Sequence, residues 1–226
     1  MGELFATYDV LGAFLMTIKL TVFSTVGALV IGTIVAVARL SPVPLLRGLG
    51  ALYVNIVRNT PLTLITVSTM LGLHSNLGIR IADPASPTSV VDTTFRWGVL
   101  ALAVYHAAFI CEALRSGVNT VPVGQAEAAR SIGLTFGQNL RHVILPQAFR
   151  GAIVPLGNTI IALTKNTTVV AVIGIAEIAY LTSTMMENDP GLILWIFVTV
   201  AAGFVILTLP LGLATTHFGR KLAVQR

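Results

Sequence analysis

The sequence predicts an all-α integral membrane protein that crosses the bilayer five times. Of its 226 residues, 55% are hydrophobic and 10% are charged, whereas about 25% of the residues in a soluble domain carry a charge. The mean hydropathy is +0.87. So few charges cannot cover a water-soluble surface, and the single cysteine cannot form an internal disulfide. The composition therefore excludes a soluble globular domain, a disordered chain and a disulfide-rich scaffold.

Five stretches are apolar enough to span the membrane, which requires roughly 20 residues at about 1.5 Å per residue. The predicted spans are about 12–38, 52–73, 97–114, 147–178 and 191–215. The fourth is too long for one straight helix, and the polar run Lys165-Asn166-Thr167-Thr168 makes it irregular. We find no internal repeat, so residues 1–226 are expected to form one transmembrane domain.

The basic residues are divided unequally between the two sides of these spans. Ten of the fourteen lysines and arginines lie in or beside the first loop, the third loop and the C-terminal tail. Two arginines and six acidic residues lie on the opposite side. Because basic residues mark the cytoplasmic side, the N-terminus is expected outside and the C-terminus in the cytoplasm. The excess of basic residues behind the net charge of +5 thus predicts the orientation of the chain in the membrane. Membrane lipid is an expected partner, and nucleic acid is not.

The third loop, about 115–146, is expected to contain two short helices. The segment 124–132 is rich in alanine, and Gly133 suits the left-handed conformation that ends many helices. Thr135-Phe136-Gly137-Gln138 has the pattern of a capping box that begins a second helix. We therefore expect a helical hairpin that projects from the membrane and presents a smooth alanine-rich surface to a partner.

Several segments resemble a known family. Glu127-Ala128-Ala129, Gly133 and Ile144-Leu145-Pro146 resemble, in residue type and spacing, the EAA motif of permease subunits of bacterial ABC importers. Arg58-Asn59-Thr60-Pro61-Leu62 is similar to a signature of the polar amino-acid permeases, with Asn59 in place of the usual glycine. The run 162–168 is similar to glutamate-uptake permeases in particular. The likeness covers nearly the whole chain.

The resemblance implies the type I ABC importer permease architecture, with five transmembrane helices and a cytoplasmic coupling helix. It implies a multi-pass subunit of the bacterial cytoplasmic (plasma) membrane that imports a polar amino acid, with glutamate expected. The chain itself is expected to be non-catalytic. An autonomous ion-coupled transporter or channel, or an intramembrane enzyme, are the alternative functions that the composition leaves open.

The resemblance also implies partners. A dimer of ATP-binding cassette ATPases would bind ATP and Mg²⁺, because this sequence contains no glycine-rich phosphate loop and is expected to hold no cofactor. A second permease subunit would complete the path, with a heterodimer favoured over a homodimer. An extracytoplasmic binding protein would deliver the amino acid. The four histidines are scattered singly, so no metal site is expected.

Candidate site residues fall into two groups. By resemblance, the residues that couple transport to the ATPase are Glu127, Ala128, Ala129 and Gly133. Polar residues inside the spans are expected to line the substrate path: Lys165, Asn166, Thr167, Thr168, Arg58, Thr60 and Glu177. Lys165 either attracts a substrate carboxylate, reaches the outer interface or pairs with Glu177. Glu177 is either this partner or a gate residue. Arg58 and Thr60 either line the inner mouth or anchor the cytoplasmic interface.

Overall fold

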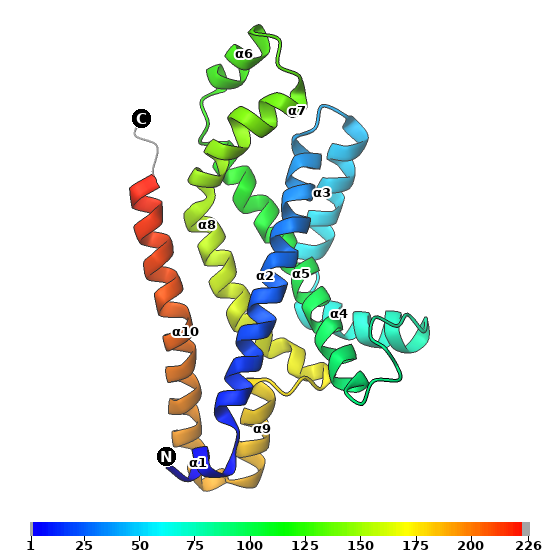
Figure 1. The fold of residues 1–226 in the computed structure, drawn as a ribbon, viewed down its shortest axis with the longest axis vertical. Coiled ribbons are helices and arrows are strands. Elements are labelled where there is room, and N and C mark those ends of the chain that lie inside the picture. The colour runs from blue at the N-terminus through cyan, green and yellow to red at the C-terminus, as the bar shows by residue number, and fades with distance from the viewer. Residues whose placement is uncertain (1, 223–226) are drawn as a thin grey trace.

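The computed structural model describes residues 2–222, which form an elongated bundle of helices without strands (Figure 1). Four long helices run along the bundle: α2 (Val10–Leu40), α5 (Ser89–Val118), α8 (Leu145–Asn166) and α10 (Ile193–Leu222). Within the described residues, four segments are long and apolar enough to cross a membrane: Val10–Leu40, Ser89–Val118, Phe136–Ile173 and Pro190–Lys221. The expectation of an all-α membrane fold is confirmed.

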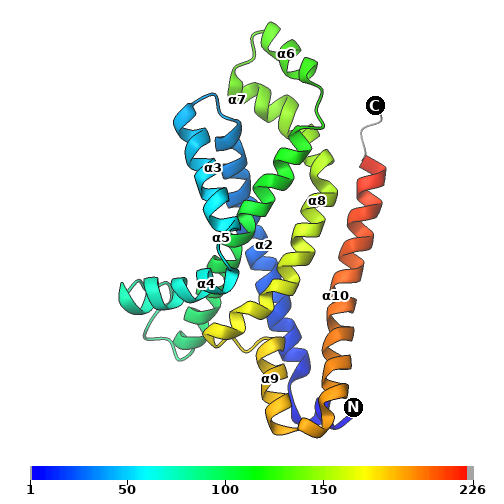
Figure 2. The ribbon, with the colours of Figure 1, turned by 180° about the vertical axis from the view of Figure 1, so that it is seen from behind.

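The centre of the bundle is the packing of α2 against α5. Small buried residues recur every four positions along α2, at Ser24, Ala28, Gly32 and Ala36. A Cβ atom at Gly32 would lie only 2.6 Å from the side chain of Ile110 on α5. Small residues allow membrane helices to approach closely, so this seam brings α5 into the core, where it lies beside α2 and α8 (Figure 2).

The second predicted span, 52–73, is wrong as one continuous helix. The helix α3 (Pro44–Arg58) begins eight residues earlier, and the chain breaks before α4 (Leu62–Val67). Pro61 lacks an amide N–H and disfavours a helical conformation in the residue before it, which explains the break. Beyond α4, a π-helical segment, Ser68–Asn76, extends sideways from the bundle, roughly perpendicular to the long helices (Figure 1).

The early start of α3 places Arg58 far from the beginning of that helix. At about 1.5 Å per residue, the fourteen steps from Pro44 to Arg58 place it about 21 Å along the helix. The Arg58 side chain is exposed at this position. Both functions expected for Arg58 and Thr60, lining the path or anchoring the interface, stay predictions.

The fourth predicted span is irregular, as expected, and its α-helical part ends within the polar run. The helix α8 ends at Asn166, and a 3-10 segment, Thr167–Ile173, follows. Gly174 then adopts φ +80°, which a glycine reaches without steric cost. The chain turns there into α9 (Ile178–Asn188), and a short 3-10 turn, Pro190–Leu192, leads to α10.

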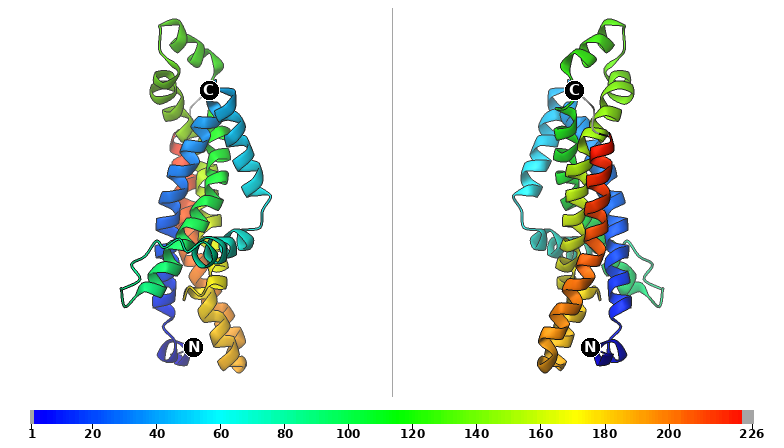
Figure 3. Two further views of the ribbon diagram at one scale, coloured as in Figure 1. Left: turned by 90° about the vertical axis from the view of Figure 1, so that its right-hand side faces the viewer. Right: turned by 90° about the vertical axis from the view of Figure 1, so that its left-hand side faces the viewer.

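The two ends of the bundle carry different structures. At one end, α6 (Val123–Ser131) and α7 (Phe136–Asn139) form a hairpin that projects beyond the long helices (Figure 3). A π-helical segment, Leu140–Ile144, joins α7 to α8. At the opposite end lie the short helix α1 (Gly2–Thr7) and α9. The two helices predicted within the third loop are thus confirmed.

Candidate functional site

The turn after α6 depends on Gly133. Its φ is +86°, its amide N–H donates to the Arg130 carbonyl at 2.9 Å, and the Leu134 N–H donates to the Ala129 carbonyl at 3.1 Å. These two bonds form a Schellman motif, which satisfies carbonyls that the end of a helix leaves unpaired. The predicted left-handed glycine is confirmed, and it sets the direction in which the chain leaves α6.

The second helix of the hairpin begins with the predicted capping box. The Gln138 amide N–H donates to the Thr135 hydroxyl at 3.4 Å, and the Gln138 side-chain oxygen accepts from the Thr135 amide N–H at 2.9 Å. The buried Asn139 donates from Nδ2 to the Ala126 carbonyl at 3.1 Å. Because this last bond joins the end of α7 to the middle of α6, the hairpin is a compact unit that can transmit a force.

The outer surface of the hairpin is apolar although it lies at the end of the bundle. Val123, Ile132 and Phe136 are 71%, 79% and 44% exposed. Glu127 is also exposed. It forms no ion pair within residues 2–222. Ala129 is buried within the hairpin. Exposed large apolar side chains at a projecting hairpin are suited to contact with a protein partner.

A cavity of about 350 Å³ opens between α5 and α8. This volume lies in the range of small-molecule sites, roughly 300–1,000 Å³. The lining residues are Tyr105, His106 and Phe109 from α5 and Asn158, Thr159, Ala162 and Asn166 from α8. The walls combine aromatic rings with amide and hydroxyl groups, a composition typical of sites for small polar ligands.

The hydrogen bonds of His106 determine how Asn166 faces this cavity. His106 Nδ1 lies 2.9 Å from the Leu102 carbonyl, and its Nε2 lies 3.1 Å from Asn166 Nδ2. A carbonyl only accepts, so Nδ1 carries the proton, and Nε2 of a neutral ring accepts from the Asn166 amide. This inferred tautomer leaves the Asn166 side-chain oxygen as an acceptor in the cavity wall.

A cation lies next to the same cavity. The guanidinium carbon of Arg58 is 5.6 Å from the centre of the Phe109 ring, within the range of a cation–π interaction. Phe109 lines the cavity, whereas Arg58 at the end of α3 contacts its ring without lining the cavity itself.

Asn166 is the one predicted path residue that lines this cavity, and Arg58, Glu177 and four others lie outside its wall. The Thr60, Thr167 and Thr168 hydroxyls each donate to a backbone carbonyl three or four residues earlier. Thr167 is fully buried. The fourth residue, Lys165, is exposed on the last turn of α8. The hydroxyl groups of the three threonines thus donate to backbone carbonyls of the preceding turn.

Glu177 has a structural position that the sequence did not reveal. It is fully buried, and its Oε1 accepts the amide N–H groups of Ala179 at 2.8 Å and Tyr180 at 3.0 Å. The carboxylate thus caps the N-terminus of α9. The alternative that pairs it with Lys165 is wrong, because no ion pair joins the two among the described residues.

At the hairpin end of the bundle, charged side chains join α2 to α5. Arg39 at the end of α2 pairs with Glu112 of α5, and Arg115 lies 3.5 Å from the same carboxylate. The Arg39 side chain is only 14% exposed, so its charge depends on this partner. Among residues 2–222, no three His, Cys, Asp or Glu side chains gather closely enough to hold a metal ion.

The α5 wall of the cavity is the part of the site that sequence patterns miss. They give His106 only a packing role, and they do not place Tyr105 or Asn158 at a site. One available signal is the spacing of Asn158, Ala162 and Asn166, which places them on one face of α8. Small and polar residues on one face of a spanning helix indicate a cavity or a partner rather than lipid.

Comparison with known proteins gives consistent matches. The family model described as "Binding-protein-dependent transport system inner membrane component" matches residues 28–224. The chain is 51% identical to the glutamate transport system permease protein of Corynebacterium glutamicum, over 96% of both chains. It is 35% identical to a probable glutamine ABC transporter permease protein of Bacillus subtilis, over 92% of this chain and 91% of that protein.

Solved structures match the fold over the same extent. A crystal structure of an amino acid ABC transporter with histidines superimposes with a TM-score of 0.78 at 28% identity, over 94% of this chain and 93% of the other. An inward facing conformation of the MetNI methionine ABC transporter superimposes with a TM-score of 0.75 at 21% identity, over 95% and 96%. The second match concerns the fold alone.

Proposed function

Because this chain belongs to the family of binding-protein-dependent transport system inner membrane components, we propose that it carries glutamate across the membrane as one subunit of an ATP-driven importer. The relative in Corynebacterium glutamicum, at 51% identity, is a glutamate transport system permease. The carrying observation is the polar cavity beside Arg58, since a permease for an amino acid needs a place for it within the bundle. The protein is a multi-pass component of the bacterial cytoplasmic membrane.

The proposed topology has five crossings, with the N-terminus outside. The second crossing is made by α3 and α4 together, with the break between them at membrane depth. An irregular backbone is tolerated there when protein or a cavity surrounds it, and the buried Leu62 of α4 contributes to a core cluster with α2 and α5. The hairpin α6–α7 and the C-terminus lie at the cytoplasmic end, in agreement with the positive-inside rule.

The ATPase pair would dock on the hairpin surface. Val123, Ile132 and Phe136 supply apolar contact area, and the exposed Glu127 supplies a negative charge. The Schellman turn and the Asn139 bond hold α6 in a fixed orientation, so a movement of the ATPase reaches α5 and α8 through the short connections at either side. ATP and Mg²⁺ would be held by the ATPase subunits and no cofactor by this chain.

A second permease subunit and an extracytoplasmic binding protein complete the proposed assembly. The cavity between α5 and α8 is open on one side, so a second subunit would close it. We favour a heterodimer, from the resemblance to glutamate-uptake permeases. The binding protein would meet the opposite end, where α1, α9 and the acidic residues of the outer loops lie.

Asn166 in the cavity wall and Arg58 against Phe109 have complementary chemistry for an amino acid. A guanidinium attracts carboxylates and can bind them through two hydrogen bonds. The Asn166 oxygen, turned outward by His106, accepts a hydrogen bond from an ammonium group. A cation inside a membrane costs on the order of 3 kcal/mol on insertion scales, so its retention beside a polar cavity supports a role in transport. Lys165 and Glu177 are proposed only to flank this path.

The experiment is uptake of labelled glutamate by the assembled importer in liposomes, with unlabelled glutamate, glutamine or arginine as competitors. Glutamate is expected to compete best. Asn166→Ala should raise the KM of uptake about tenfold, the effect of losing one hydrogen bond to a charged group. Asn55→Ala is the matched control, because Asn55 is exposed on α3 and does not line the cavity.

Stronger competition by arginine than by glutamate would contradict the proposed substrate. Equal KM values for Asn166→Ala and Asn55→Ala would contradict the proposed site. The two outcomes are independent, because the competitors test the identity of the amino acid and the variants test where in the chain it passes.

A further inference from the structure

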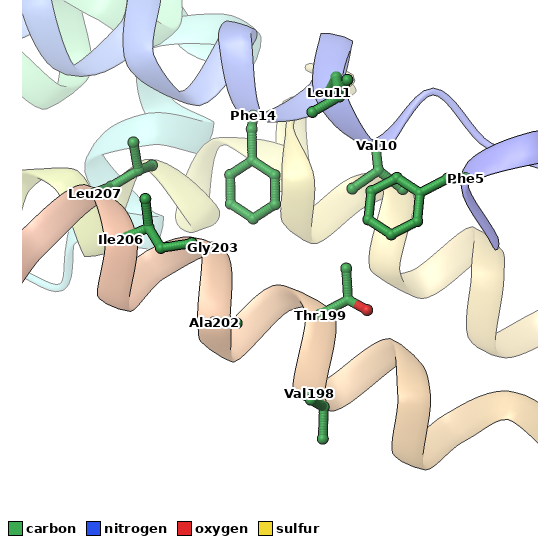
Figure 4. A pocket seen from close by; sticks show the side chains of 10 residues that line it. All are labelled: Phe5, Val10, Leu11, Phe14, Val198, Thr199, Ala202, Gly203, Ile206 and Leu207. Carbon is green, nitrogen blue, oxygen red and sulfur yellow. The ribbon is translucent and has the colours of Figure 1, made fainter. Parts of the chain in front are cut away.

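An apolar slot of about 360 Å³ lies between the start of α2 and the outer half of α10, at the end of the bundle opposite the hairpin (Figure 4). Nine of its ten lining residues are apolar or glycine, and Thr199 is the exception. Apolar cavities of this size in proteins stay dry and take up apolar ligands. The slot is therefore suited to a hydrocarbon group and not to an amino acid.

The slot has defined walls. Phe14 of α2 lies against Gly203 of α10, where a Cβ atom would be only 2.0 Å from the ring. The Phe14 ring also meets Phe204 edge to face, with 6.0 Å between the ring centres. Figure 4 shows Phe14 and Phe5 facing α10 across the space. These contacts hold α2 and α10 together at one side and leave the slot between them.

A polar cavity of about 410 Å³ adjoins the slot and shares Phe5, Val10 and Leu11 with it. Its remaining lining includes the polar residues Thr7, Tyr8 and Asp9 and no lysine or arginine. The Tyr8 hydroxyl donates to Asp189 at 2.6 Å, which brings a second carboxylate to this end. The apolar slot thus opens onto a polar, acidic mouth.

We propose that the slot binds one acyl chain of a phospholipid whose amine-bearing headgroup lies at the Asp9 mouth. The α10 wall, from Val198 to Leu207, spans nine residue steps, or about 14 Å. That length is close to half of a hydrocarbon core of about 30 Å, so the slot accommodates the chain of one leaflet. Its assignment to the outer leaflet rests on the proposed orientation.

Hydrophobic transfer does not drive this binding, because bilayer tails are as apolar as the slot. Selectivity comes from close packing along the slot and from the acidic mouth, which attracts an amine and repels an anionic headgroup. The site should therefore distinguish phosphatidylethanolamine from phosphatidylglycerol, which share the same acyl chains and differ in headgroup charge.

The test is native mass spectrometry of the assembled importer in detergent after addition of each lipid separately. Ala202→Trp places an indole in the slot, and Val205→Trp is its control, because Val205 is exposed on α10 outside the slot. The wild type and Val205→Trp are expected to retain one phosphatidylethanolamine per chain. Ala202→Trp should reduce retention about tenfold, as expected when a side chain occupies the packing space.

Asp9→Asn tests the headgroup. Asp9 accepts the Gly12 amide N–H at 2.8 Å, and asparagine caps helices equally well, so only the charge changes. This variant is expected to retain phosphatidylethanolamine and phosphatidylglycerol equally.

If Ala202→Trp prevents assembly of the importer, Ala202→Leu replaces it as the variant that fills the slot.

Equal retention by the Ala202 and Val205 variants would overturn the proposal. Loss of permease pairing in Ala202→Trp with unchanged lipid retention would also overturn it, and would instead identify the slot as a contact with the second subunit. Neither result depends on glutamate uptake, so failure of this inference is distinct from failure of the proposed function.

Discussion

Replacing Gly133 with valine should weaken the docking of the ATPase through the backbone alone. The residue adopts φ +86°, and no atom lies within 4 Å of the position where a Cβ atom would be added. Valine would therefore meet no neighbour, and its whole cost is that of the left-handed conformation. Without that conformation, the Gly133 and Leu134 amides cannot both reach the last carbonyls of α6.

The left-handed conformation costs an ordinary residue about 1–2 kcal/mol, and a branched β-carbon makes it a marked outlier. A change of one or two kcal/mol alters the ratio of ordered to disordered hairpin about 5- to 30-fold. The affinity of the hairpin for its partner falls in proportion to the ordered fraction, because only the ordered form can dock. The loss reaches this full factor when the disordered form of the variant predominates. The Gly133→Asn variant should lose less affinity, since asparagine visits this conformation more readily.

The assay is binding of the purified ATPase subunit to the permease in lipid nanodiscs. Gly124→Val is the matched control, because Gly124 lies in the same hairpin, on α6, with open space around it and is not among the glycines with positive φ. The Gly133→Val variant is expected to bind more weakly than this control, by up to about 30-fold. Equal binding by the two variants would refute the role assigned to the turn.

Further variants test three separate contacts. His106→Leu leaves the Asn166 amide unpaired, which should raise the KM of glutamate uptake about tenfold; an unchanged KM would exclude the positioning role. Glu112→Ala removes the partner of Arg39 and should destabilise the detergent-purified protein by about 1.5–3 kcal/mol, whereas Arg115→Ala should cost less than about 0.5 kcal/mol, as compared by thermal unfolding. Glu177→Ala should cost about 1 kcal/mol through the lost cap of α9, and Glu177→Gln should recover part of it in the same measurement.

The hairpin was predictable from the sequence because its signals are local. Gly133 ends one helix, and Thr135 with Gln138 begins the next, within six residues of each other. Each signal concerns atoms a few bonds apart, and no distant part of the chain competes with them. The long membrane-spanning helices were also predictable, because their length and apolar composition suffice to identify them.

The second span shows where composition fails. The stretch 52–73 is apolar throughout, but apolar content does not report where the backbone can remain helical. Pro44 favours a helix start and Pro61 a helix break, and both were visible in the sequence. Giving these two prolines more weight than the apolar count would have placed Arg58 at the end of a helix that begins at Pro44.

The cavity could not be predicted, because its walls come from residues far apart in the chain. His106 and Asn166 are sixty positions apart, and each reads in isolation as an ordinary polar residue in an apolar helix. Only the packing of α5 against α8 brings them within hydrogen-bond distance. The role of Glu177 was hidden for a related reason, since the turn at Gly174 that creates a helix start cannot be located from apolar periodicity.

The most direct test of the account is the energy source of transport. Liposomes that contain the permease pair, the ATPase subunits and ATP on the cytoplasmic side, with the binding protein outside, should accumulate labelled glutamate. Accumulation should stop when ATP is replaced by ADP and should continue when ionophores collapse the ion gradients. Accumulation that persists without ATP and disappears with the ionophores would contradict the account and identify an ion-coupled transporter.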